Sequence, residues 1–126
     1  MLKEDGRKSL LVNSRRKGAS FERELAIMMR EAFPGVGVRR GIQYRSGSEA
    51  ADVEHPYFWV EAKRGRKPLV RGALSQASDA TDGRKPLVVI RDDRRPPFMV
   101  MWLDDLLPIL EEWWKWKEIQ SESPDG

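Results

Sequence analysis

Two acids and a lysine stand close together in the stretch ADVEHPYFWVEAKRG, residues 51–65. Asp52 lies nine residues before Glu61, and Lys63 follows Glu61 by two. Side chains two apart on a strand point to the same face, so Glu61 and Lys63 share a face with Trp59. Such charges beside a strongly apolar strand are either a solvated strand end or parts of a functional site.

Asp52 falls on a preceding short strand that can pair with the Glu61 strand through the turn at His55-Pro56. This pairing brings both carboxylates and the amine of Lys63 within side-chain reach. Two crowded carboxylates repel and are hard to keep ionised. A divalent cation relieves the repulsion by binding both, and the Ala62 carbonyl is a candidate further oxygen ligand.

The composition restricts which metal such a site can take. The chain has no cysteine and one histidine, which excludes thiolate-based zinc and iron–sulfur sites and an all-imidazole site within one chain. Oxygen ligands remain, and these suit Mg²⁺ or Mn²⁺.

A third acid, Glu22, lies in the helical pattern of residues 19–33, ASFERELAIMMREAF. At 100° per residue, Glu22 falls inside the apolar arc that contains Phe21, Leu25 and Met29. An unpaired charge facing inward costs several kcal/mol. We therefore expect Glu22 to have a partner, either a metal cluster or a lysine.

The elements that must position these residues follow from periodicity and turn signals. A helix capped by Ser20 comes first, and residues 1–18 form a basic arm ahead of it. Two more helices and five strands give the order α-β-β-β-α-β-β-α, which predicts an α/β fold with a mixed sheet of about five strands flanked by helices. The expected ranges are strands near 36–38, 51–54, 57–63, 86–91 and 96–103, helices over 71–82 and from Asp104, and a frayed tail at 121–126.

Length and charge bound the class of protein. A chain of 126 residues fits one domain, and no apolar run reaches membrane-spanning length, so we expect a cytoplasmic protein (host cytoplasm if viral) without membrane partners. Residues 1–48 carry eleven Lys and Arg against five Asp and Glu, whereas residues 104–126 carry two against seven. A basic front half faces nucleic acid in many proteins, although a solvated Arg-rich surface has the same composition.

The segments KGASFEREL, ADV and VEAKRG together resemble the archaeal-type Holliday junction resolvases, members of the PD-(D/E)xK, restriction-endonuclease-like nuclease superfamily. The resemblance spans about residues 16–91. It implies a restriction-endonuclease-like nuclease domain over 1–126, with Mg²⁺ as cofactor, Mn²⁺ as a substitute and no nucleotide cofactor. Ala51 departs from the proline usual in the family, and the acidic, Trp-rich final segment has no counterpart in the resemblance.

The resemblance also implies roles for individual residues. Asp52 and Glu61 would be metal ligands, Glu22 the helix-borne acid and a further metal ligand, and Lys63 the catalytic lysine. The loop RSGSEA would place Ser46 or Ser48 near the scissile phosphate. Gln76, in the second helix, is a possible site contact or a surface residue.

Basic residues flanking this site are expected to follow DNA phosphates with no demand for base-specific contacts. They are Arg15, Arg16, Lys17, Arg39, Arg40, Arg45, Arg64, Arg66 and Lys67. A four-way junction has approximate two-fold symmetry and requires paired cuts, so a C2 homodimer is expected. The strand PFMVMW and the Trp-rich helix are candidate dimer surfaces, because so small a domain cannot bury all its tryptophans.

The sequence thus predicts a Mg²⁺-dependent endodeoxyribonuclease of DNA recombination and repair that resolves four-way junctions by paired symmetrical nicks. One alternative is another PD-(D/E)xK nuclease that acts on flaps or duplex DNA. A second is a catalytically silent DNA-binding module on the same fold.

Overall fold

A computed structural model describes residues 2–41, 50–65 and 69–122, with side chains in the first helix from residue 16 onward. Three helices and five strands alternate in the order expected from the sequence. They are α1 (Leu2–Ala32), β1 (Arg39–Arg40), β2 (Val53–Glu54), β3 (Phe58–Gly65), α2 (Val70–Ala80), β4 (Lys85–Asp92), β5 (Phe98–Val100) and α3 (Leu103–Glu122).

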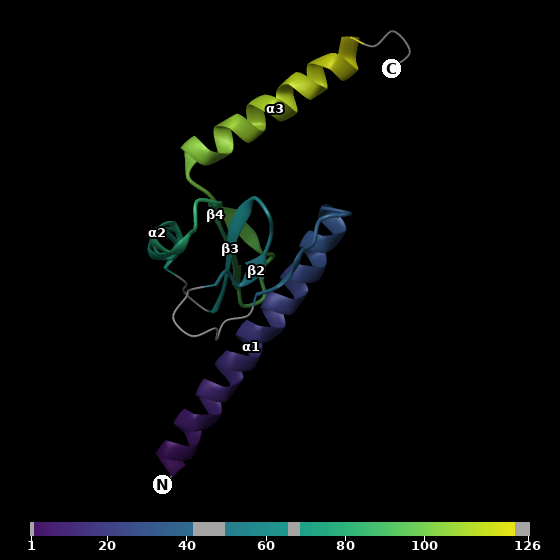
Figure 1. Ribbon diagram of the computed structural model, residues 1–126. Coiled ribbons are helices and arrows are strands. Elements are labelled where there is room, and N and C mark those ends of the chain that lie inside the picture. Colours follow the sequence, from purple (N-terminus) through teal and green to yellow (C-terminus); the bar gives the residue numbers. More distant parts are fainter. Residues whose placement is uncertain (1, 42–49, 66–68, 123–126) are drawn as a thin grey trace.

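The five strands form one mixed sheet in the order β1-β2-β3-β4-β5. All neighbours pair antiparallel except β3 and β4, which run parallel. A parallel pair needs a crossover connection, and α2 supplies it. Helices α1 and α2 lie on opposite sides of the sheet (Figure 1). The predicted α/β class, with a mixed five-stranded sheet flanked by helices, is confirmed.

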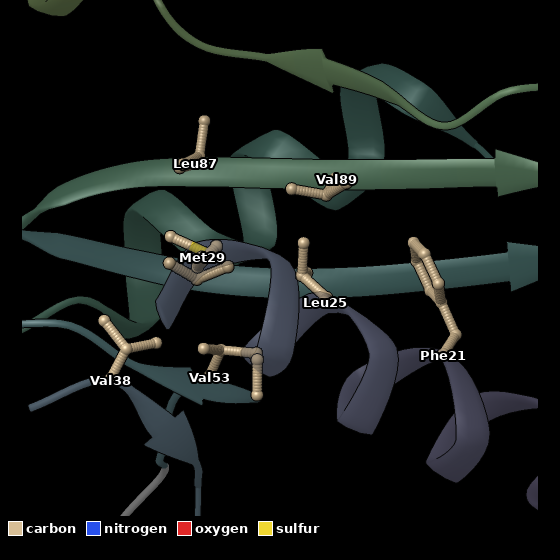
Figure 2. Close-up of a cluster of buried hydrophobic side chains, with 9 residues drawn as sticks. Phe21, Leu25, Met29, Val38, Val53, Leu87 and Val89 are labelled. Atoms are coloured by element: carbon tan, nitrogen blue, oxygen red, sulfur yellow. The ribbon is translucent and has the colours of Figure 1, made fainter. Parts of the chain in front are cut away.

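One face of the sheet is covered by the second half of α1. Phe21, Leu25 and Met29 recur at helical spacing and are buried against strand residues such as Val53 and Val89. Figure 2 shows these helix side chains directed at the valines and leucine of the sheet. This contact fixes which face of α1 turns inward, and therefore where Glu22 can lie.

The other face of the sheet packs against α2. Ala73, Leu74 and Ala77 form the buried stripe of that helix. Trp59 and Ile90 meet this stripe from β3 and β4. The centre of β4 is buried on both faces, as expected of a strand with a continuous apolar run. Small residues on α2 let the helix approach the sheet closely enough to enclose the Trp59 indole.

Most element ends differ from the sequence-based expectation by one to three residues, and Asp52, expected on the second strand, directly precedes β2. The first helix and the first strand need separate comment. The first helix begins at Leu2, so the predicted cap at Ser20 is wrong, and residues 2–18 continue the helix backbone where an arm without helical periodicity was expected. The first strand lies at Arg39–Arg40. Val38, the residue before this strand, is buried in the core. In both places tertiary packing and helix continuation override a local signal.

The third helix projects from the sheet instead of covering it (Figure 1). None of its twenty residues, all of which the structure describes, is buried. Its start is anchored by two contacts: the Trp102 indole donates to Ser78 Oγ at 2.6 Å, and Lys85 Nζ lies 3.7 Å from Asp105 Oδ1. No helix in the described part of the chain is both long and apolar enough to cross a membrane.

Replacing Phe21 with alanine tests the α1 packing. Phe21 is 2 % exposed, whereas Ile27 on the same helix is 51 % exposed. We expect Phe21→Ala to lower the free energy of unfolding by about 3–5 kcal/mol, and Ile27→Ala by about 0.5 kcal/mol or less. Chemical denaturation of both variants measures the difference, and equal losses would contradict the observed orientation of α1.

Candidate metal-dependent active site

The candidate site lies where β2 and β3 separate. Their register ends with Val53 opposite Val60, and the Asp52 amide donates to the Val60 carbonyl at 2.9 Å. Beyond this point the Ala62 amide donates to Asp52 Oδ2 at 2.9 Å, so a side chain takes the place of a ladder carbonyl. Where the strand pairing ends, this hydrogen bond holds the Asp52 carboxylate against the backbone of β3.

Glu61 is oriented by its strand neighbour two residues earlier. The indole Nε1 of Trp59 donates to Glu61 Oε1 at 2.9 Å. Trp59 is itself 3 % exposed, and the Arg84 guanidinium lies 5.0 Å from the centre of its ring. A buried indole requires a hydrogen-bond acceptor, and here the acceptor is a site carboxylate, so the α2-side core fixes the position of Glu61.

The carboxyl groups of Asp52 and Glu61 meet in this opening. Burial, followed by the hydrogen bond and the charge of Asp52, raises the pKa of Glu61 to about 8. The Trp59 indole and the charge of Lys63 act in the opposite direction. Two adjacent negative charges in a partly buried site repel, so the neighbouring Asp52 favours the protonated form of Glu61.

Lys63 completes the set of residues expected on this face. Its charge acts on Glu61, which is consistent with both side chains projecting from β3 on the side that α2 covers. The Ala62 amide points towards Asp52. In an antiparallel ladder the amide and carbonyl of one residue face the same neighbouring strand, so the Ala62 carbonyl lies on the Asp52 side of β3.

These donors fit a hard divalent cation. Two carboxyl groups and a main-chain carbonyl are the oxygen ligands that Mg²⁺ takes in proteins. One oxygen of each carboxyl group accepts a hydrogen bond from the protein, which sets the direction of the other oxygen. A cation between the two groups would offset the same repulsion that protonation of Glu61 offsets. Asp52, Glu61 and the Ala62 carbonyl would therefore hold the metal.

Glu22 faces inward, as expected, and an arginine on β1 is one of its partners. Its side chain is 12 % exposed, and Arg40 Nε donates to Glu22 Oε2 at 2.9 Å. Among the described residues, no three His, Asp or Glu side chains form a group that could hold a metal ion. Glu22 meets β1 at the edge of the sheet, and its role as a further metal ligand beside Asp52 and Glu61 stays a prediction.

Several predicted DNA-contacting residues are described by the structure. Arg16 and Lys17 on α1 and Arg39 and Arg40 on β1 are exposed, while Arg64 on β3 is half-buried. Lys17 Nζ lies 4.0 Å from Asp93 Oδ2, which leaves its charge partly balanced. Gln76 lies on the exposed side of α2. Outside the described residues or side chains lie Arg15, Arg45, Ser46, Ser48, Arg66 and Lys67.

Sequence reasoning missed two residues that shape the site. Trp59 was placed on the correct face but given no role, although an indole two residues from an acid on a strand is a detectable signal. Gly41 was overlooked: its amide donates to the Asp52 carbonyl at 2.9 Å, and a Cβ there would clash with the Ala51 carbonyl oxygen. This close approach depends on tertiary structure and leaves no local sequence pattern.

The raised pKa of Glu61 predicts how stability depends on pH without a metal. The unfolded chain releases the Glu61 proton near pH 4.5, whereas the folded chain keeps it to about pH 8. The folded state binds more protons in this window, so the free energy of unfolding falls as pH rises from 5 to 8. Denaturation in EDTA across this range should show a flatter profile for Glu61→Gln than for the unchanged chain.

A direct titration separates this effect from other groups. The ¹³C signal of the Glu61 carboxyl should titrate near pH 8 in EDTA and at lower pH with Mg²⁺, because a bound cation favours the ionised form. A midpoint near 4.5 without metal would show that the two carboxyl groups do not interact.

Comparison with known proteins gives no relative for this chain: no family model, no curated protein and no solved structure matches it.

Proposed function

We propose that this protein is a Mg²⁺-dependent endodeoxyribonuclease that recognises DNA structure, with a four-way junction as its substrate. The observation that carries the proposal is the contact between the Asp52 and Glu61 carboxyl groups at the opening between β2 and β3, with Lys63 on the same face. Asp-x₈-Glu-x-Lys in this placement is the arrangement that the resemblance implies.

Phosphodiester hydrolysis would give Asp52, Glu61 and Lys63 each a chemical role. When bound, Mg²⁺ would polarise a phosphoryl oxygen and lower the pKa of a bound water. Asp52 and Glu61 hold the ligand oxygens in fixed directions, because Ala62 and Trp59 donate to them. Lys63 would orient the attacking water or neutralise the charge that develops on the phosphate.

The basic residues supply the affinity for DNA. Arg16 on α1 and Arg39 on β1 are exposed and would contact phosphates, which positions a duplex without reading its sequence. Paired cuts on a junction need two active sites related by a two-fold axis, so the proposal includes a homodimer. Glu22 and its partner Arg40 would lie beside the DNA path at the β1 edge.

Cleavage of three labelled substrates tests the proposal. A synthetic four-way junction, a flapped duplex and a plain duplex are incubated with Mg²⁺ or with EDTA. We expect symmetrical nicks in opposite strands of the junction, with Mg²⁺ only. Cutting of the flap or duplex instead would move the function to another nuclease class, and binding without cutting under Mg²⁺ or Mn²⁺ would identify a DNA-binding module.

Conservative changes at the paired acids should separate binding from cleavage. Asp52→Asn and Glu61→Gln each remove a metal-binding charge, and several kcal/mol of transition-state stabilisation depend on it. Since 1.36 kcal/mol corresponds to a factor of ten, we expect cleavage to fall by at least about a hundredfold while junction binding persists.

Glu24→Gln is the matched control, because Glu24 is exposed on α1 and pairs with Arg91 on β4. This variant should cut junctions at the rate of the unchanged chain. Retained cutting by Glu61→Gln would overturn the assignment of the site.

A further inference from the structure

The third helix exposes an amount of apolar surface that is unusual for a single chain. Its three tryptophans are each more than half exposed, and Leu103, Leu107 and Leu110 are exposed as well. Burial of large aromatic side chains dominates interface energetics. No residue of α3 is buried in either core, yet the start of the helix is fixed by Trp102 and Asp105. Its apolar side is therefore available for contact with a partner.

The apolar residues of α3 form one stripe. At 100° per residue, eight of them fall within about half of the helix circumference. They are Leu103, Leu106, Leu107, Ile109, Leu110, Trp113, Trp114 and Trp116. The opposite side carries most of the charged residues, among them Glu111, Glu112 and Glu118. Lys117 is the exception: it lies within the stripe, with its amine over the rings of Trp113 and Trp116. A helix of this pattern buries its stripe against another apolar surface.

The stripe is continuous with an apolar groove. The groove has a volume of about 410 Å³ and is lined only by apolar side chains, from the end of α1, from the sheet and from the first turns of α3. Leu106 and Ile109 belong to both surfaces. A partner that covers the stripe of α3 would therefore also reach the groove beside β5.

The order of residues along the stripe makes it complementary to the same stripe in reverse direction. Leucines occupy the first half of α3 and tryptophans occupy the second half. We propose that α3 pairs antiparallel with α3 of a second copy of this chain, about a two-fold axis near Leu110. In this register Leu107 faces the second copy's Trp113, and Leu106 faces its Trp114, so small side chains pack against large ones on both sides of the axis.

Charge supports the same direction of pairing. The half Leu103–Glu112 carries four acids and no base, whereas residues 113–122 carry two acids and two lysines. Antiparallel pairing sets the acidic half of each helix beside the half of the other that carries both lysines. Parallel pairing would set both acidic halves side by side and the tryptophans against each other, which is unfavourable in charge and in volume.

The apolar surface of α3 and the groove approaches the area that a stable dimer buries. Three half-exposed tryptophans expose on the order of 300 Å² per copy. The exposed leucines and the groove add to this area and bring it towards the roughly 800 Å² per partner that stable interfaces bury. In a two-fold symmetric interface the same surface patch of each copy makes the contact.

This dimer specifies the homodimer included in the proposed function, but its evidence is independent of catalysis. It requires neither DNA nor a metal. The tests below are therefore made in EDTA without DNA, so that failure of the dimer and failure of the nuclease assignment remain distinct.

Light scattering after size exclusion of the full chain measures the oligomeric state. We expect twice the chain mass, and a single-chain mass for Leu110→Glu, which places a charge at the two-fold axis. Lys115→Glu is the matched control, because it adds an acid on the outward side of α3, and it should remain a dimer. A monomer at all concentrations, or a dimeric Leu110→Glu variant with unchanged circular dichroism, would overturn the proposal.

Engineered disulfides test the direction of the pairing, and the absence of cysteine from the chain makes them unambiguous. Leu110→Cys should form a covalent dimer on mild oxidation, and Glu112→Cys, on the outward side, should not. Leu107→Cys and Trp113→Cys should each stay uncrosslinked alone and crosslink when the two variants are mixed. Crosslinking of Leu107→Cys with itself would show parallel pairing and contradict the model of an antiparallel pair.

Discussion

The candidate site depends on one unfavourable contact that the fold maintains. Asp52 and Glu61 are pressed together at the separation of β2 and β3, and each is held by a donor that belongs to the frame of the domain. The amide of Ala62 fixes one acid and the indole of Trp59 fixes the other. The repulsion between the two groups raises the pKa of Glu61, and a cation bound between them would relieve it.

The sheet explains why these acids cannot relax apart. Glu61 lies on β3, which pairs with β4 along its full length in the centre of the sheet. Asp52 precedes β2, whose short pairing with β1 and β3 ends beside it. Gly41 lets the chain beyond β1 approach the Asp52 carbonyl more closely than a side chain would permit. A rigid strand and a constrained strand end thus face each other across the site.

Much of this could be predicted from the sequence, because strong periodicity determines where helices and strands occur. The order of elements, the shared face of Trp59 and Glu61 and the inward direction of Glu22 all follow from spacing. The contact between Glu22 and Arg40 does not, because it depends on which sheet face α1 covers. The start of α1 and the close approach at Gly41 depend likewise on contacts between distant segments.

The hydrogen bond from Trp59 to Glu61 has a consequence for how this protein can change. The same side chain fills the space beneath α2 and aims an acid of the site. A substitution that loosens the packing around this indole would therefore also alter the acid's direction, even at a distance from any substrate. The packing of the interior and the direction of the Glu61 carboxyl group therefore both depend on a single aromatic ring.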